Sequence, residues 1–190
     1  MVQWTPDLFL YHGSYCAVPH PALAKCNPNK DFGLGFYVTT SKEQAMRFVP
    51  SAIRKAVRLG KIAPDTLFGF VSIYRFNLTS ALSLYEFETA NVEWLHCVAA
   101  HRKRSAFPAV ITELEPFDLI AGKIANDQTN ATLTAYLSGL YGELGSREAD
   151  EECIRRLMPE RLENQICFRT DTALSALRYE GEERICLNLL

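Results

Sequence analysis

Short runs of apolar and β-branched residues, each ended by glycine or by polar turn residues, recur along the chain and predict β-strands. The first run extends from Leu8 to Tyr11 and is closed by Gly13, so that His12 lies at the end of a strand. A strand over residues 68–77 carries Val71, Ile73 and Phe76 in alternation. Further strands are expected at residues 36–40, 82–87, 117–125, 165–168 and 184–187.

Apolar residues at helical spacing predict helices between these strands. Ser41 and Gln44 fit a capping box, and the helix that they begin carries Pro50 inside it and Gly60 at its end, so residues 41–61 form one helix or two short ones. Asn126 and Asp127 are expected to form a turn. Four other helices are predicted. One begins at Asn91, a second covers residues 131–140, a third covers residues 147–158 and ends at Pro159, and a short fourth follows a Thr170 cap through Leu174 and Leu177.

Strands and helices alternate in this prediction without the regular rhythm of βαβ units. The fold class is therefore α+β, with a mixed sheet as its core and helices on the outside. A chain of 190 residues fits one domain of this kind and buries an adequate core without disulfides, so residues 1–190 are interpreted as a single domain.

The charge of the chain excludes a protein that chiefly coats nucleic acid, because 20 basic and 22 acidic residues give a net charge of −2. The one dense basic run extends from His101 to Arg104. We favour a solvated helix end for this run, and a phosphate-binding patch is the alternative.

Six cysteines and four histidines are scattered without Cys-x-x-Cys or zinc-site spacing. We therefore expect buried or free thiols and no metal site. The chain begins with no basic and then apolar leader, and no apolar run approaches the length of a membrane span. A cytoplasmic protein without a membrane partner is expected.

Two glycine-flanked segments carry candidate chemistry. In the first, His12 offers an imidazole to a ribose hydroxyl, Gly13 lets a ligand approach the backbone, and Ser14 adds a hydroxyl. In the second, Gly33 and Gly35 bracket a turn before Tyr37, whose ring suits stacking on a flat cationic ring. The alternatives are a packed His12, a Tyr37 in the core beside Phe36, and a Thr39 that serves only the strand and the helix start; Phe36 and Tyr37 face opposite sides of a strand.

Four motifs together resemble a known superfamily: Tyr-His-Gly-Ser at 11–14, Asp-Phe-Gly-x-Gly-Phe-Tyr-x-Thr-Thr at 31–40, the segment from Ile120 to Asp127, and Asn-Gln-Ile-Cys-Phe-Arg-Thr at 164–170. The first two resemble the His-Tyr branch of the ADP-ribosyltransferases, which includes diphtheria toxin and the poly(ADP-ribose) polymerases. All four resemble a bacterial family described as a domain of unknown function and grouped with that superfamily. The resemblance implies a single ADP-ribosyltransferase-like domain with a split mixed β-sheet.

The resemblance also implies roles for particular residues. NAD would be bound as a substrate by His12, Gly13, Ser14, Tyr37 and Thr39, with His12 at the adenosine ribose, the Gly13 backbone at the nicotinamide carboxamide and Tyr37 stacked on the nicotinamide. The catalytic glutamate of the superfamily aligns with Gln165. An amide orients the sugar hydroxyl but carries no charge for the oxocarbenium-like transition state, and loss of one such preorganised group commonly costs a hundred- to a thousandfold in rate, about 3 to 4 kcal/mol. Glu163, two residues earlier in the strand, is a candidate for supplying that charge.

The expected function is therefore transfer of ADP-ribose from NAD to a protein or nucleic-acid acceptor, as in a bacterial toxin with an antitoxin protein as partner. Two alternatives stay open. A binding module would keep NAD without turnover, and an NAD glycohydrolase would transfer ADP-ribose to water. The acceptor is not specified, because acceptor loops vary independently of the NAD site.

Overall fold

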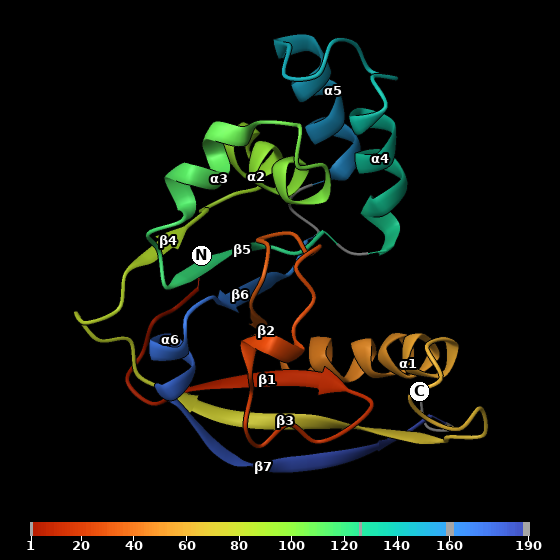
Figure 1. Ribbon diagram of the computed structural model, residues 1–190, viewed down its shortest axis with the longest axis vertical. Coiled ribbons are helices and arrows are strands. Elements are labelled where there is room, and N and C mark those ends of the chain that lie inside the picture. The colour runs from red at the N-terminus through yellow and green to blue at the C-terminus, as the bar shows by residue number, and fades with distance from the viewer. Residues whose placement is uncertain (1, 126, 159–161, 188–190) are drawn as a thin grey trace.

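The computed structural model describes residues 2–125, 127–158 and 162–187 and has an α+β architecture (Figure 1). A three-stranded antiparallel sheet contains β1 (Leu8–Ser14), β3 (Phe68–Phe76) and β7 (Leu177–Cys186) in the order β1-β3-β7. A β-bulge interrupts the β3–β7 register after Ile73, opposite Gly181, which has a φ of 141°. Glycine adopts this backbone conformation without strain.

A second sheet of four strands has the order β2-β6-β5-β4. Its strands are β2 (Phe36–Val38), β4 (Leu84–Glu86), β5 (Leu119–Lys123) and β6 (Asn164–Phe168). Strands β4 and β5 are parallel, whereas β6 is antiparallel to both of its neighbours, so this sheet is mixed.

The two sheets meet at one point of β-pairing. Tyr11 of β1 and Thr39, just after β2, exchange both main-chain hydrogen bonds, at 2.8 and 2.9 Å, as an isolated antiparallel bridge. Leu10, Tyr74 and Phe76 from the first sheet pack with Phe36, Ile166 and Phe168 from the second in a shared core. The sheet is therefore split, and its halves are joined mainly through side chains.

Helix α1 (Lys42–Arg58) packs against β1 and β3 of the three-stranded sheet. Ser41 caps it, because its hydroxyl accepts from the Gln44 amide at 3.1 Å, as the capping box predicts. The helix continues through Pro50, so the structure has the single helix of the two alternatives. Gly13 lies so close to α1 that a Cβ there would be 2.1 Å from the Ala45 carbonyl oxygen.

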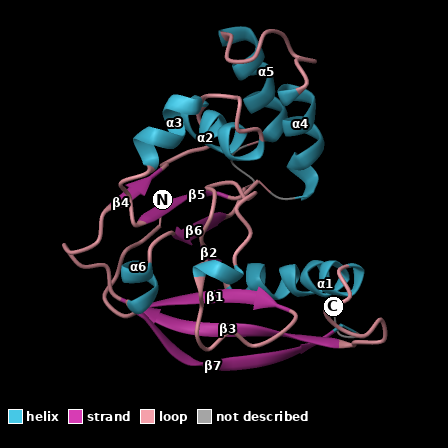
Figure 2. Cartoon of the chain, viewed as in Figure 1, coloured by secondary structure: helices cyan, strands magenta, loops and turns pink. Residues whose placement is uncertain are grey.

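Four helices gather on the side of the four-stranded sheet away from the three-stranded sheet (Figure 2). They are α2 (Val92–Arg102), α3 (Pro108–Leu114), α4 (Asp127–Leu137) and α5 (Arg147–Leu157). The fully buried Trp94 belongs to their core, and a buried Asp150 on α5 joins them by accepting from the Tyr136 hydroxyl and from His96 Nε2 at 2.8 Å. Short elements α6 (Asp171–Ser175) and the 3₁₀ turn Leu23–Lys25 complete the described fold.

Several predicted elements differ from the structure. Strand β1 continues through Gly13 to Ser14, so His12 lies inside the strand and not at its end as expected, because Gly13 and Ser14 still pair with β3. Helix α3 follows Phe107, whose φ of 48° is left-handed, and no helix was predicted there from the sequence. Helix α4 begins at Asp127, four residues before the expected start, and Asn126 and Pro159 lie outside the described residues. Strand β7 begins at Leu177, where a helix was expected, because this edge strand carries charged residues in place of a clear apolar alternation.

Candidate functional site

His12 lies on β1 with its ring between the two sheets. Its Nδ1 is 2.7 Å from the Tyr37 carbonyl oxygen, and its ring centroid is 4.5 Å from that of Phe36. A carbonyl oxygen only accepts hydrogen bonds, so Nδ1 carries the proton and Nε2 is left as an acceptor in the neutral ring. Burial lowers the pKa of His12, which favours this neutral form at neutral pH.

Gly13 presents main-chain groups next to this imidazole. Residues of an antiparallel strand turn their amide and carbonyl alternately to either side, and those of Tyr11 point to Thr39. Two residues further on, Gly13 turns its own amide and carbonyl to the same side. The bridge between Tyr11 and Thr39 is isolated, so the β1–β2 ladder does not continue to Gly13, and the His12 ring bonds the Tyr37 carbonyl instead.

Ser14 and Thr39 differ in their surroundings. Ser14 is buried at the end of β1. The Thr39 hydroxyl donates to Gln44 Oε1 at 2.5 Å and accepts from the Ser41 amide at 3.1 Å, so it fixes the start of α1.

Tyr37 lies on the other face of β2 from Phe36, as their alternation predicts. Its hydroxyl donates to the Gly33 carbonyl at 2.8 Å and accepts from the Phe32 amide at 3.0 Å. Burial raises the pKa of this hydroxyl well above its ordinary value, so it remains protonated. His12 and Tyr37 are thus brought together through the Tyr37 backbone, and their rings occupy different faces of β2.

Gln165 is buried at the start of β6, with 6% of its surface exposed. Its Nε2 donates to Asp31 Oδ2 at 2.9 Å and approaches the Lys123 carbonyl oxygen at 3.4 Å. Asp31 also accepts from Arg102 at 2.9 Å and from the Ala125 amide at 2.9 Å. Asp31 belongs to the 31–40 motif but has no predicted role, because a carboxylate next to a Phe-Gly turn is the only signal for it in the sequence.

Glu163 points elsewhere. Its carboxylate, with 42% of the side chain exposed, forms an ion pair with Arg47 of α1. The two candidate catalytic residues therefore have separate partners, with Gln165 joined to Asp31 in the interior and Glu163 joined to α1 at the surface.

The basic run from His101 to Arg104 is not a simple solvated helix end, which corrects the expectation for its first two residues. His101 packs against Gly33, where a Cβ would be 2.5 Å from the His101 ring, and burial lowers the pKa of this histidine. Arg102 binds Asp31 and also donates to Asn130 at 2.8 Å. Both side chains contact protein and not solvent alone, because α2 ends against the loop that precedes β2.

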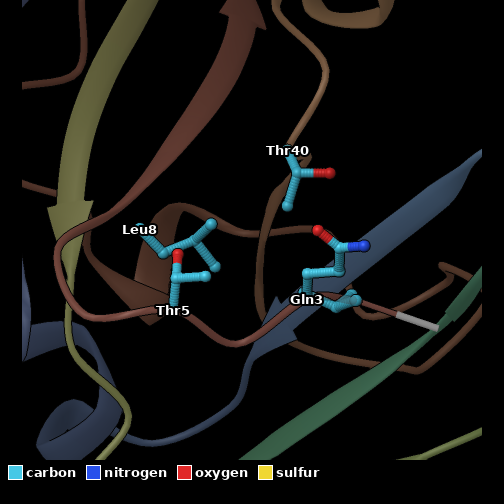
Figure 3. Close-up of a pocket in the computed structure, with 5 residues that line it drawn as sticks. Gln3, Thr5, Leu8 and Thr40 are labelled. Carbon is cyan, nitrogen blue, oxygen red and sulfur yellow. The ribbon is translucent and has the colours of Figure 1, made fainter.

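A pocket of about 330 Å³ lies between the N-terminal segment, the start of β1 and the residue after Thr39 (Figure 3). It is lined by Val2, Gln3, Thr5, Leu8 and Thr40. The N-terminal segment beside it is fixed by Glu86, which accepts from the Val2 amide at 2.6 Å and from Trp4 Nε1 at 2.8 Å. None of the residues proposed from the sequence to bind NAD lines this pocket.

All six cysteines carry free thiols. Within the described ranges, no group of three or more His, Cys, Asp or Glu side chains is arranged to hold a metal ion. No helix in the described part of the chain combines the length and the hydropathy that crossing a bilayer requires.

A family model described as "Protein of unknown function (DUF3990)" matches residues 8–179. The chain belongs to this family. The match begins at the first residue of β1 and ends within β7, so the family pattern includes both sheets and every candidate site residue. None of the curated proteins compared with the chain matches it.

Proposed function

We propose that this protein is an NAD-dependent ADP-ribosyltransferase, which transfers ADP-ribose from NAD to a protein or nucleic-acid acceptor. The observation that carries the proposal is the neutral His12 imidazole, whose Nδ1 bonds the Tyr37 carbonyl and whose Nε2 is left as an acceptor, together with the adjacent Gly13, which has no β2 partner among the described residues. A ribose hydroxyl can donate to that nitrogen, and a carboxamide can pair with an amide and a carbonyl on the same strand edge.

In the proposed reaction, the Gly13 main chain holds the nicotinamide carboxamide and His12 Nε2 accepts from the adenosine ribose. The C1′–N bond of the nicotinamide ribose breaks, and neutral nicotinamide leaves with the electron pair. The acceptor nucleophile then attacks C1′ and loses its proton. The Gln165 amide would accept from the 2′-hydroxyl of that ribose, which orients the sugar while positive charge develops on it.

Two further features support this assignment. The two hydrogen bonds of the Tyr37 hydroxyl to the Phe32–Gly33 backbone fix the orientation of its ring. One face of that ring is stacked on Phe32, with the ring centroids 6.5 Å apart, so nicotinamide would have to stack on its other face. The split between two sheets, with His12 on one and Tyr37 on the other, agrees with the resemblance of the 11–14 and 31–40 motifs to the His-Tyr ADP-ribosyltransferases.

A second candidate function is an NAD-binding module without turnover, and the uncharged Gln165 favours it. Charge-assisted hydrogen bonds are roughly twice as strong as neutral ones, so the amide would support binding better than catalysis. Hydrolysis of NAD, with water as the acceptor, differs from the first proposal only in its acceptor.

Calorimetric titration with NAD tests the site. We expect His12→Ala to weaken NAD binding by at least about tenfold, because it removes a hydrogen bond inside the site. The exposed His20 provides the matched control, and His20→Ala should bind like the wild type. Equal affinities of all three proteins would rule out the His12 site.

Labelled NAD then separates the functions. Label that moves to macromolecules of a cell lysate, with release of nicotinamide, supports the transferase. Free ADP-ribose without labelled macromolecules indicates a glycohydrolase, and binding without nicotinamide release indicates the binding module. No binding and no turnover would refute the proposed function.

A further inference from the structure

Asp31, in the loop before β2, connects three other parts of the chain at the candidate site. Its Oδ1 accepts from Arg102 at the end of α2, and its Oδ2 accepts from the Ala125 amide after β5 and from Gln165 Nε2 on β6. Only 6% of Asp31 is exposed. A buried carboxylate that receives hydrogen bonds from a guanidinium, a main-chain amide and a side-chain amide is held in a single orientation.

This arrangement also fixes the orientation of the Gln165 amide. The two ends of an amide are ordinarily distinguished only by their hydrogen-bond partners. One end of the Gln165 amide faces Asp31 Oδ2 and the Lys123 carbonyl oxygen, and both of these oxygens only accept hydrogen bonds. The NH₂ group must therefore face Asp31, and the carbonyl oxygen lies on the opposite side of the amide.

We propose that Asp31 is a positioning residue of this site, which holds the Gln165 amide with its oxygen presented to the ribose and makes glutamine, rather than glutamate, the residue that the site requires at position 165. That a ribose is the group bound by the Gln165 oxygen rests on the proposed function. The Asp31–Gln165 hydrogen bond itself is present without a ligand. The carboxylate polarises the amide through the hydrogen bond, which strengthens the acceptor oxygen at its far end.

A carboxylate at position 165 would conflict with its surroundings. It would lie about 3 Å from Asp31 and close to the Lys123 carbonyl oxygen, and two carboxylates at such a distance share one proton. Among the described residues, Arg102 is the cation bonded to Asp31. Arg169 lies close enough that, besides the larger effect of burial, its charge acts to lower the pKa values of Cys97, His101 and Cys167, but its own hydrogen bonds go to main-chain carbonyls. The Lys123 ammonium is directed to the Leu162 carbonyl, and Glu163 is paired with Arg47. The other titratable groups that interact with Asp31 are Tyr37, Cys97, His101 and Cys167, all with pKa values shifted by burial towards the uncharged form.

The variant Gln165→Glu tests the contact without any ligand. The nearby Asp31 carboxylate raises the pKa of the introduced carboxyl group in the folded state above that of a solvated glutamate. The folded variant is therefore most stable at low pH and loses this stability as the pH rises through the raised pKa. We compare the melting temperature of the variant with that of the wild type at each pH. The deficit of the variant should be larger at about pH 8 than at about pH 5, by on the order of 5 °C. The matched control Gln3→Glu makes the same change at an exposed residue and should show no such trend.

The double variant Asp31→Asn/Gln165→Glu exchanges which partner carries the charge. It should melt above Gln165→Glu at about pH 8 and show a weaker dependence on pH, because only one carboxylate remains beside Arg102. A difference in melting temperature between Gln165→Glu and the wild type that does not change with pH would overturn the inference. The single variant is sufficient for this conclusion, whatever the double variant shows.

Nicotinamide release from NAD tests the positioning role. We expect Gln165→Glu to lower kcat at about pH 8 by at least about tenfold, with kcat recovering as the pH falls and in the double variant. A Gln165→Glu variant that is faster than the wild type at that pH would overturn the inference, because the glutamine would then be a simple loss of the catalytic charge. If the wild type neither binds nor cleaves NAD, the proposed function fails, while the melting measurements still decide whether Asp31 holds Gln165.

Discussion

Single residues in this protein are constrained most strongly where two backbones touch. Gly13 lies against the main chain of α1, and a Cβ there would be 2.1 Å from the Ala45 carbonyl oxygen. Real Cβ atoms do not approach so closely, and a helix backbone cannot move aside as a side chain can. The same residue carries the strand edge proposed to hold nicotinamide, so packing requires its lack of a side chain and the proposed binding would require it as well.

We expect Gly13→Ala to lower the free energy of unfolding by about 3 kcal/mol, because α1 must shift away from β1. Urea unfolding monitored by circular dichroism measures the change. Gly122→Ala is the control, since its nearest neighbours are side-chain atoms of Phe32 and Phe87 at 3.0 Å or more, which need to move by only a few tenths of an ångström. Equal losses in the two variants would show that the contact with α1 is not the constraint.

At the scale of elements, Asp118 at the start of β5 joins three segments. It accepts from the Ser83 amide at 2.9 Å and hydroxyl at 2.8 Å, before β4, and from the Thr170 hydroxyl at 2.6 Å. Thr170 in turn caps α6, because its hydroxyl accepts from the Ala173 amide at 3.1 Å. These bonds, above all that of Thr170, lower the pKa of Asp118.

A carboxyl group whose pKa is lower in the folded state stabilises the fold above its unfolded pKa, and that contribution is lost as the pH falls through the folded value. Asp118→Asn should therefore lower the melting temperature at pH 7, and the difference from the wild type should shrink towards about pH 2. Differential scanning calorimetry across this range measures it. Asp65→Asn, at an exposed aspartate, should differ little from the wild type at either end; a difference for Asp118→Asn that is independent of pH would contradict this account.

Elements with a local signal were predictable from the sequence, and those that depend on distant contacts were not. The Ser41 cap and the β3 strand depend on adjacent residues, and both are confirmed. The predicted alternation within β3 is not, because Val71 and Phe76 pack in different cores and Ile73 is only half-buried. Strand β7 is polar and forms because β3 offers an edge to pair with, which no local pattern reveals. Helix α3 depends on the left-handed Phe107 before Pro108.

The candidate site divides in the same way. The motifs placed His12 and Gly13 on one strand and Tyr37 on another, and the structure has them on β1 and β2, which belong to different sheets. The pairing of Asp31 with Gln165 joins residues 134 positions apart, and that of Arg47 with Glu163 joins residues 116 apart. Contacts over such separations follow from the complete fold, so a single sequence could not predict that the two candidate catalytic residues have different partners.

At the scale of the whole molecule, three thiols report on the core that joins the helices to the four-stranded sheet. Cys97, Cys153 and Cys167 are fully buried within it, on α2, α5 and β6. Burial raises the pKa of Cys153 and of Cys167 to about 12, and it raises the pKa of Cys97 as well. Cys16 and Cys186 are exposed, and Cys26 is half-buried.

The thiolate is the species that alkylating reagents attack, so a raised pKa and burial both slow the reaction. In the native protein we expect iodoacetamide to modify Cys16 and Cys186 first and the three core thiols only after unfolding, with their rates lower by at least about a hundredfold. Mass spectrometry of peptides from samples quenched over time gives each rate, and the same reaction in urea shows that all six thiols react once exposed. Because the three core thiols lie on separate elements of one core, they should become reactive together when that core opens. Rapid native labelling of Cys167 at the rate of Cys186 would mean that the helices separate readily from the sheet, and the contacts that place Asp31 against Gln165 would then not be held as described.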